Sequence, residues 1–236
     1  MIKAVLFDLD GTLLPLDMDV FVPSYFGRLA KHLASYGMDT ELLIKAIWAG
    51  THAMIKNDGA TTNERVFWRV VNELFGYDVE KEHSAHFEEF YEKHFDEIAA
   101  DCGFTPRSAE TVSRLHEMGI RTVLATNPVF PRIATQKRIR WAGLSEDDFL
   151  LYTTYENSRH CKPNPSYYLD VLEECGLRAE ECLMVGNDAI EDMVPLSLGM
   201  KVFLLTDCLY NKKDVDISDY PRGGFDEMWE YINSLL

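Results

Sequence analysis

Two acidic residues follow a short apolar run near the N-terminus at a spacing that suits metal-assisted chemistry. Asp8 and Asp10 lie two residues apart, so in an extended chain both carboxylates project from one face, and Gly11 permits an abrupt turn beyond them. Two carboxylates in a small space repel each other unless a cation intervenes, and Mg²⁺ prefers such oxygen ligands. The alternative interpretation is that Asp8 caps a turn and Asp10-Gly11 forms it, which is common for these residue types.

Two further polar clusters also follow apolar runs. Thr126-Asn127 offers a hydroxyl and a backbone N–H to an anion near a helix start, although either residue can simply cap a helix. Lys162 is followed by Pro163 and Pro165, which stiffen its backbone, although a single lysine is usually a solvated surface charge. Each cluster alone therefore leaves a purely structural alternative open.

Asp188 and Asp192 form the fourth cluster, directly after Gly186-Asn187. We expect Asp188 at a helix start and Asp192 one turn later on the same face, where the two acids could share a metal ion. The alternative is that Asp188 is an N-cap and Asp192 a favourable charge in the first turn. If each cluster were only a helix cap or turn, we would not expect two acidic pairs, a hydroxyl and a lysine to occur together at four strand ends. Together, the four clusters indicate phosphoryl transfer.

The elements that must position these clusters alternate between strands and helices. Apolar runs predict strands over residues 4–7, 121–125, 149–152, 182–185 and 201–205. Helical spacing predicts helices over residues 108–118, 130–141, 165–175, 190–198 and 225–236, and residues 208–224 are typical of a long loop. Such alternation predicts an α/β fold with a parallel sheet covered by helices. Ligands bind outside the carboxyl ends of such strands, which is where the four clusters lie.

Residues 20 to 100 show a different pattern. Apolar residues recur there at helical spacing, and turn-forming residues around Gly37, Gly59 and Gly76 separate four predicted helices. One short strand cannot bury itself beside helices alone, so the first strand must join the sheet and the helices interrupt the α/β domain. We therefore expect an α/β core of residues 1–16 and 101–236 and a helical insertion of residues 17–100. Within the insertion we expect core packing, rather than an interface, for Trp48, Phe67 and Trp68.

Charge and composition exclude several classes of partner. The chain has 39 Asp and Glu against 23 Lys and Arg, a formal net charge of −16, which repels nucleic acids and anionic membranes. No apolar segment approaches the roughly 18 residues of a membrane span, and the N-terminal apolar run is too short for a signal peptide. Five cysteines without a C-x-x-C pair indicate reduced thiols, so we expect a cytoplasmic protein.

The four clusters also match the motifs of a known family. The run from Val5 to Leu13 resembles the first motif of the haloacid dehalogenase superfamily, in which D-x-D-G-T-L/V marks the phosphatase branch. The clusters at Thr126-Asn127, at Lys162-Pro163-Asn164-Pro165 and from Gly186 to Asp192 are similar to the second, third and fourth motifs, in the family's order. The resemblance implies a Rossmann-like core with a C1-type helical cap inserted between the first and second motifs.

The resemblance implies catalytic and metal-binding roles for four aspartates. Asp8 would attack phosphorus and form an aspartyl-phosphate, and Asp10 would be the general acid and base. Mg²⁺ would be held by Asp8, the backbone carbonyl of Asp10 and Asp188. Asp192 would act from behind these ligands. The fourth motif often reads G-D-x-x-x-D in the family, whereas here Asn187 precedes Asp188, so Asp188 is assigned by its spacing to Asp192.

The same resemblance implies which residues bind the phosphoryl group. Thr126, the backbone N–H of Asn127 and Lys162 would hold its oxygens and offset their charge. The substrate would be a small phosphorylated metabolite, whose identity the sequence does not give. The oligomeric state is equally open.

Three other functions remain as alternatives. A phosphomutase would keep the whole core and differ in how the cap positions a sugar phosphate. Its cap contacts would be found among polar residues that otherwise form a solvated helix face, namely His32, Lys45, His52 and Lys56. Hydrolytic dehalogenases of the superfamily lack the second aspartate that Asp10 supplies. A non-catalytic binding module is disfavoured because the residues of all four motifs are present.

Overall fold

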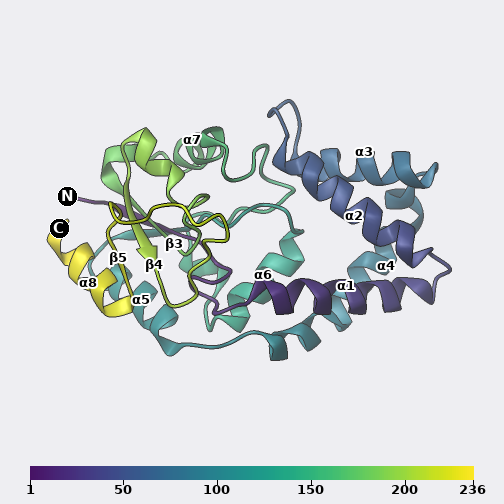
Figure 1. Ribbon diagram of the computed structural model, residues 1–236, viewed down its shortest axis with the longest axis horizontal. Coiled ribbons are helices and arrows are strands. Elements are labelled where there is room, and N and C mark those ends of the chain that lie inside the picture. The colour runs from purple at the N-terminus through teal and green to yellow at the C-terminus, as the bar shows by residue number, and fades with distance from the viewer.

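The protein has an α/β part and a four-helix part that lie side by side (Figure 1). The computed structural model describes residues 1–236. Five parallel strands form one sheet in the order β2-β1-β3-β4-β5, with β1 spanning Ala4–Phe7, β2 Arg121–Leu124, β3 Cys182–Gly186, β4 Lys201–Leu205 and β5 Arg222–Gly223. The predicted α/β fold with a parallel sheet is confirmed.

The inner strand β1 is buried on both faces, as parallel strands usually are. Its side chains alternate, because Val5 and Phe7 join one apolar cluster while Ala4 and Leu6 join the other. The first cluster includes side chains of α5 (Pro106–Glu117), α6 (Arg132–Trp141) and α8 (Phe225–Ser234), and the second includes side chains of α7 (Pro165–Glu174). Helices therefore cover both faces of the sheet.

The register of β1 determines where the polar edge of the sheet lies. Phe7 pairs with Leu124 of β2 on one side and with Val185 of β3 on the other. The N–H of Asp8 donates to the Val185 carbonyl at 2.9 Å, and the N–H of Ala125 donates to the Phe7 carbonyl at 2.7 Å. The residues that leave these three strands therefore start from the same edge of the sheet.

Two predicted elements are wrong in detail. The predicted strand over residues 149–152 contributes only an isolated bridge between Tyr152 and Leu124. The backbone N–H of Thr153 donates to the Leu124 carbonyl at 3.1 Å, and the chain turns away at residues 155–157. The predicted helix over residues 190–198 is a turn followed by the short 3₁₀ helix η4 (Val194–Leu198). Pro195 lacks the N–H that an α-helix needs at that position.

Four α-helices form the insertion that follows β1 in the chain, as the sequence predicts: α1 (Met18–Ala34), α2 (Thr40–Ile55), α3 (Asn63–Phe75) and α4 (Val79–Lys93). Each starts after a residue whose side chain accepts a hydrogen bond from the first turn, namely Asp17, Asp39, Thr62 and Asp78. A 3₁₀ helix, η1 (Phe95–Asp101), leads back to the α/β part. Leu29 of α1 and Phe90 of α4 belong to the same apolar cluster as Phe7, so the two parts share a continuous core.

A buried asparagine ties the start of α3 to the α/β part. Asn63 is 0% exposed, and its backbone N–H donates to the Ser158 carbonyl at 2.8 Å. Its side-chain amide donates to the carbonyls of Pro128 and His160, each at 3.3 Å. These bonds join α3 to the loops that follow β2 and precede α7.

No helix combines the length and the apolar character that crossing a membrane requires. The five cysteines are free thiols, and Cys161, Cys175 and Cys182 are buried.

Candidate active site

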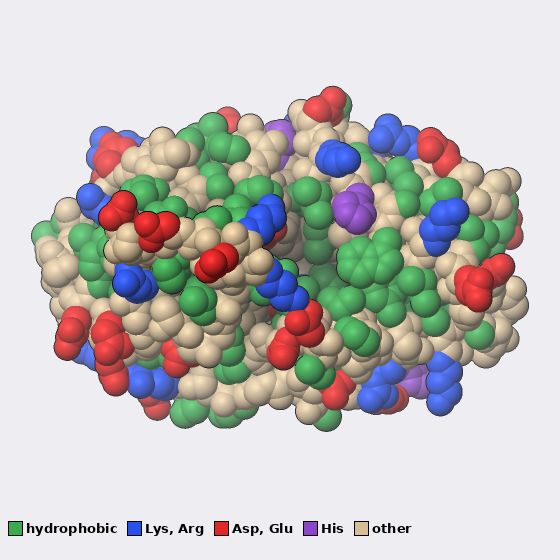
Figure 2. Space-filling view, viewed as in Figure 1, with side chains coloured by type: hydrophobic (Ala, Val, Ile, Leu, Met, Phe, Trp, Pro, Cys, Tyr) green, Lys and Arg blue, Asp and Glu red, His purple; other side chains and the backbone are tan.

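One cavity of about 1020 Å³ lies at the polar edge of the sheet, against the start of α1. Its wall contains six of the seven predicted site residues, namely Asp8, Asp10, Thr126, Asn127, Asp188 and Asp192. The seventh, Lys162, lies behind Asp8 and contacts it. Figure 2 shows that the surface is hollowed where the α/β part and the helical part meet. The fold thus gathers residues that are far apart in the sequence around one cavity, the candidate catalytic cavity, called the catalytic cavity below.

Lys162 lies between two buried acids. Its Nζ is 2.8 Å from Oδ1 of Asp8 and 2.7 Å from Oδ1 of Asp192, and its side chain is 1% exposed. Burial opposes the charge of this lysine, but Asp192 and Asp8 raise the pKa of Lys162 well above its ordinary value. The ammonium group therefore stays charged and holds the Asp8 carboxylate at the end of β1.

Asp192 connects Lys162 to the backbone of the next loop. Its Oδ2 accepts a hydrogen bond from the N–H of Asp188 at 2.9 Å, while its Oδ1 faces Lys162. Burial raises the pKa of Asp192 to about 7, against the opposing charge of Lys162. Gly186 is required beside it, because a Cβ there would lie 2.1 Å from Oδ2 of Asp192. Asp192 therefore positions other residues of the cavity.

Asp10 has a cation of its own, Arg138 of α6. The Arg138 side chain is 1% exposed, forms an ion pair with Oδ2 of Asp10, and lies over the ring of Phe130 at 4.4 Å from its centroid. Burial raises the pKa of Asp10 above its ordinary value, although Arg138 lowers it. Oδ1 of Asp10 is buried without a hydrogen-bond partner, so this oxygen is available to a ligand.

Thr126 and Asn127 follow β2 and are held by different parts of the structure. The Thr126 carbonyl accepts hydrogen bonds from the hydroxyls of Thr153, at 2.6 Å, and Tyr167, at 2.9 Å. The side-chain amide of Asn127 donates to Oε2 of Glu191 at 3.0 Å, and its Oδ1 is buried without a partner. The hydroxyls of Thr153 and Tyr167 therefore hold the backbone of the loop after β2, while Thr126 and Asn127 border the cavity.

Asn187 and Asp188 have distinct environments. Asn187 is 6% exposed, accepts a hydrogen bond from the Thr12 hydroxyl at 3.2 Å and donates to the Cys208 carbonyl at 2.8 Å. Asp188 uses Oδ1 to accept two backbone N–H groups of its own turn, at 2.7 and 2.8 Å, and borders the cavity. The side chain of Asn187 thus joins neighbouring loops, whereas Asp188 caps a turn with one oxygen and keeps the other free of these bonds.

The donor atoms of the cavity fit a hard cation such as Mg²⁺. Asp8, Asp188 and the Asp10 backbone carbonyl offer oxygen alone, and Mg²⁺ commonly takes one or two carboxylates and keeps water in its remaining positions. No three Asp, Glu, His or Cys side chains lie together as a complete ligand set, which does not suit a structural zinc site. Acids outnumber bases in the wall, with Asp8, Asp10, Asp17, Asp19, Asp101, Asp188, Glu191, Asp192 and Asp207 against Lys212. An anionic ligand would need a further cation here.

Comparison with known proteins identifies the family. The sequence profile described as haloacid dehalogenase-like hydrolase matches residues 2–196, which include all four polar clusters. The chain belongs to this family. A protein of Xenopus laevis, phospholysine phosphohistidine inorganic pyrophosphate phosphatase, is 32% identical over 75 residues, which are 31% of this chain. The match spans 26% of that relative's length.

Solved structures with this haloacid dehalogenase fold differ in the reactions that their names state. The 2-haloacid dehalogenase of Pseudomonas syringae pv. tomato has a TM-score of 0.67 at 20% identity over 100% of both chains. The HAD phosphatase of Thermococcus onnurineus has a TM-score of 0.60 at 19% identity over 98% of both chains. The β-phosphoglucomutase of Clostridium difficile has a TM-score of 0.58 at 18% identity over 100% of this chain and 97% of its own. The likeness establishes the fold, and the residues must decide the reaction.

Two residues of this hydrolase's cavity region were not predicted. Arg138 lies four residues after the buried Ala134, on the face of α6 that also buries Ile139, and a charge on such a face needs a partner. Glu191 accepts the Asn127 amide, and burial raises the pKa of Glu191 to about 7 while Lys162 opposes the shift. The sequence shows that Arg138 lies on the buried face of its helix, but it does not show that Asp10 is its partner. None of the four polar cap residues suggested as substrate contacts lines this cavity: His32, Lys45, His52 and Lys56.

Proposed function

We propose that this haloacid dehalogenase-like hydrolase is a Mg²⁺-dependent phosphatase that cleaves a small phosphorylated metabolite through an aspartyl-phosphate on Asp8. The observation that carries the proposal is a pair of carboxylates at the end of β1, each with its own buried cation. Lys162 pairs with Asp8, and Arg138 pairs with Asp10. Two acids held by different partners can take different roles in one reaction.

In the first step, an oxygen of Asp8 attacks phosphorus, and the bond between phosphorus and the ester oxygen breaks. Asp10 gives its proton to the departing oxygen, so the leaving group departs as a neutral alcohol. Lys162 keeps the attacking carboxylate in place, which lowers the entropic part of the barrier. The phosphoryl group is then bound covalently to Asp8.

In the second step, water attacks the phosphorus of the aspartyl-phosphate. Asp10, now a carboxylate, takes a proton from that water, and the bond between phosphorus and the Asp8 oxygen breaks. Asp8 returns as a carboxylate, Asp10 returns protonated, and inorganic phosphate leaves. The net reaction converts an ester and water into an alcohol and phosphate.

The transferred group carries negative charge into an acidic cavity, so it needs positive partners. Thr126, the backbone N–H of Asn127 and Lys162 would hold the phosphoryl oxygens. Mg²⁺ would be held by Asp8, Asp188 and the backbone carbonyl of Asp10. When bound, it supplies charge that neutralises the phosphoryl oxygens.

Asp10 favours a phosphatase over a dehalogenase. An ester oxygen needs a proton to leave as an alcohol, whereas a halide leaves as a stable anion. A second acid that can protonate the leaving group is therefore needed for cleavage of the phosphate ester and not for loss of a halide. The Xenopus laevis relative carries phosphatase in its name, which supports the same choice over the segment that matches.

The helical insertion and the thiols complete the proposal. Residues 17–100 would act as a C1-type cap, because Met18 at the start of α1 borders the catalytic cavity and the four helices continue from it. A cytoplasmic location fits the five free cysteines.

Hydrolysis of 4-nitrophenyl phosphate tests the proposed function. We expect phosphate release with Mg²⁺ and none with EDTA, and we expect Asp8→Asn to lower kcat by at least about 10⁴-fold because the nucleophile is lost. Asp219→Asn, on an exposed loop, is the matched control and should be fully active. An active Asp8→Asn enzyme would overturn the mechanism. Interconversion of sugar phosphates without phosphate release would replace the phosphatase by a phosphomutase.

A further inference from the structure

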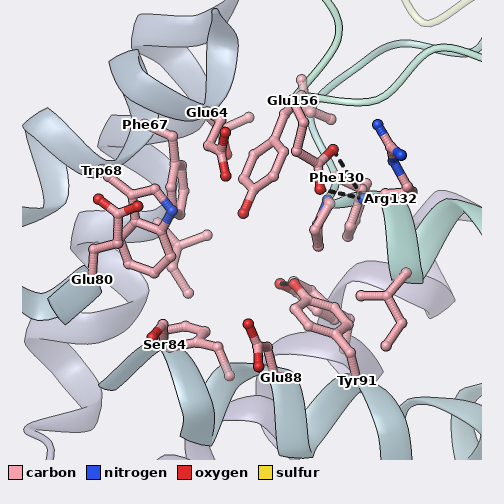
Figure 3. Close-up of a pocket in the computed structure, with 18 of the residues that line it drawn as sticks. Glu64, Phe67, Trp68, Glu80, Ser84, Glu88, Tyr91, Phe130, Arg132 and Glu156 are labelled. Atoms are coloured by element: carbon pink, nitrogen blue, oxygen red, sulfur yellow. Dashed lines mark hydrogen bonds between the residues drawn. The ribbon is translucent and has the colours of Figure 1, made fainter. Parts of the chain in front are cut away.

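A second cavity, of about 500 Å³, lies among the four helices where they meet the loop after β2 (Figure 3). Small-molecule sites typically measure about 300 to 1,000 Å³, so this helical cavity has the right size. It shares Met18, Val129 and Phe130 with the wall of the catalytic cavity. Neither step of the proposed reaction uses its other residues.

Aromatic rings from all four helices and from two loops line the helical cavity, among them Tyr25, Trp48, Phe67, Trp68, Phe87 and Tyr155. Phe67 and Trp68 are buried, as predicted for the insertion, but Trp48 is 43% exposed. The prediction of core packing is therefore wrong for Trp48. Its ring borders a cavity instead, and an aromatic wall attracts cations through the negative faces of its rings.

The wall also contains five carboxylates that form no side-chain ion pair: Glu64, Glu80, Glu88, Glu92 and Glu156. Glu64 and Glu156 enter from one side and Glu88 from the opposite side, and Glu64 lies beside the ring of Phe67 (Figure 3). Arg132 is the one basic residue in the wall, and the bond that it gives to Glu156 comes from its backbone N–H, at 2.8 Å.

The glutamates of α4 differ in their ion pairs between the cavity face and the outer surface of the helix. On α4, Glu89 points away from the cavity and pairs with Lys93 at 2.7 Å. Glu80 and Glu88, which line the cavity, form no ion pair. Burial, with the charges of Glu156 and Glu80, raises the pKa of Glu64, although the charges of Arg65 and Arg132 oppose the shift. Glu64 thus lies in a locally negative part of the wall.

We propose that the helical cavity binds an organic cation, an ammonium group on an apolar body, which is the leaving-group end of the substrate. The aromatic rings take the apolar body, and the glutamates take the charge. An inorganic cation would not use the rings, and a neutral apolar ligand would leave the glutamates unpaired. The negative net charge of the whole protein does not explain why aromatic rings and a cavity lie beside these glutamates.

The substrate assignment rests on the proposed function and on the wall that the two cavities share. The ring of Phe130 borders both cavities and lies 4.4 Å from the guanidinium of Arg138, which pairs with Asp10. A phosphate ester bound at Asp8 would therefore extend past Phe130 into the helical cavity. The substrate class is a phosphate monoester of an amino alcohol or of an amine-bearing phenol.

Direct binding of 2-phenylethylamine tests the cation site without any reaction. Trp48 and Trp68 line the cavity, so tryptophan fluorescence reports binding, and calorimetry checks it. The neutral counterpart 2-phenylethanol should bind at least about tenfold more weakly, because it lacks the charge. Rising NaCl concentration should weaken the binding of the amine alone. Equal binding of amine and alcohol would overturn the proposal.

A pair of double variants localises the effect. Glu64→Gln with Glu88→Gln should weaken 2-phenylethylamine binding by about tenfold, because two carboxylates of the cavity become neutral. Glu73→Gln with Glu82→Gln makes the same change of net charge on the same two helices, outside the cavity, and should leave affinity unchanged. Equal weakening by both pairs would reduce the effect to net charge and overturn the site.

Kinetics separate this inference from the proposed function. Tyramine O-phosphate carries an ammonium group that 4-ethylphenyl phosphate lacks, and we expect a kcat/KM at least about tenfold higher for the amine ester. The Glu64, Glu88 double variant should lose this preference, and the Glu73, Glu82 control should keep it. If 4-nitrophenyl phosphate is cleaved but the two esters react equally, the cation site is wrong and the phosphatase stands. If no ester is cleaved, the phosphatase and the substrate assignment fail, and amine binding alone decides the cation site.

Discussion

The catalytic cavity and the helical cavity treat charge in opposite ways. In the catalytic cavity, Lys162 is shared by Asp8 and Asp192, and both the lysine and Asp192 are 1% exposed. In the helical cavity, Glu80 and Glu88 are exposed and form no ion pair. A buried charge without a partner has a high desolvation cost, whereas a charge in contact with water is stable without a partner and is free to bind a ligand.

The two cavities also differ in what positions their side chains. Asp8 follows a strand that is hydrogen-bonded on both sides, so its place is set by backbone register. The rings of Trp48 and Trp68 stand on helices, and their places depend on how those helices pack. A rigid sheet edge suits chemistry, which tolerates little displacement, and a helical wall can vary with the ligand.

The largest expected effect comes from removing the shared cation of the catalytic cavity. Lys162→Met leaves two buried carboxylates unpaired, so we expect a loss of about 4 kcal/mol in the free energy of unfolding, measured by urea denaturation. Lys45→Met, on the exposed face of α2, should stay within about 0.5 kcal/mol of the native protein. Similar losses for the two variants would contradict the difference between buried and exposed charge.

Removing the cation beside Asp10 should cost slightly less. Arg138→Met leaves Asp10 unpaired, but the Asp10 side chain is 19% exposed, so water partly replaces the guanidinium and we expect a loss of about 3 kcal/mol. Arg140 lies on the same helix and pairs with Glu146 at the surface, where its side chain is 61% exposed. We expect Arg140→Met to cost less than about 1 kcal/mol. An unchanged free energy of unfolding in Arg138→Met would show that the buried ion pair is not needed to hold Asp10.

Close packing behind the catalytic cavity gives an intermediate effect. A Cβ at Gly186 would lie 2.1 Å from Oδ2 of Asp192, so Gly186→Ala should destabilise the protein by about 2 kcal/mol and lower turnover of 4-nitrophenyl phosphate. A Cβ at Gly27, inside α1, would meet no atom within 4 Å. Gly27→Ala should therefore stabilise the protein by about 0.5 kcal/mol or more, because alanine favours helices. Unchanged stability and activity in Gly186→Ala would mean that Asp192 can move freely.

The smallest effect, with the opposite sign, is expected in the helical cavity. The pKa of Glu64 is raised by burial and by Glu156 and Glu80, so ionised Glu64 costs stability. Its favourable contribution to folding is complete below the ordinary pKa of a glutamate and is lost as the pH rises through the raised pKa of the folded state. Glu64→Gln should therefore stabilise the protein at neutral pH, by no more than about 0.5 kcal/mol, and not at acid pH.

Glu73→Gln, at an exposed position of the same helix, is the control and should show no such pH dependence. Thermal unfolding at two pH values measures both variants. A gain in stability together with weaker binding of 2-phenylethylamine is the signature of a ligand site. A stability loss in Glu64→Gln at neutral pH would contradict it.

Local sequence patterns were sufficient for most of the elements and insufficient where tertiary contacts compete. Strand β4 spans Lys201–Leu205, as predicted, because the four apolar residues after Lys201 form one continuous buried run. Tyr152 follows an apolar run of the same kind, yet it forms only one bridge. The backbone N–H of Thr153 makes a last bond to the Leu124 carbonyl, and the chain then turns away from β2. The helix predicted across Pro195 likewise gives way to a turn and a 3₁₀ helix.

The sequence by itself determined which groups stand at the strand ends. Buried parallel strands are apolar, so the first polar residues after them, such as Asp8 and Thr126, mark the edge where ligands bind. Only the tertiary structure decided which charges meet. Asp10 and Arg138 are 128 residues apart, and in the sequence Arg138 looks like any other charge on a basic helix. Likewise, Glu64 and Glu88 are typical of solvated helix faces until packing encloses a cavity between them, because helix packing, and not local pattern, sets which side chains of distant segments face each other.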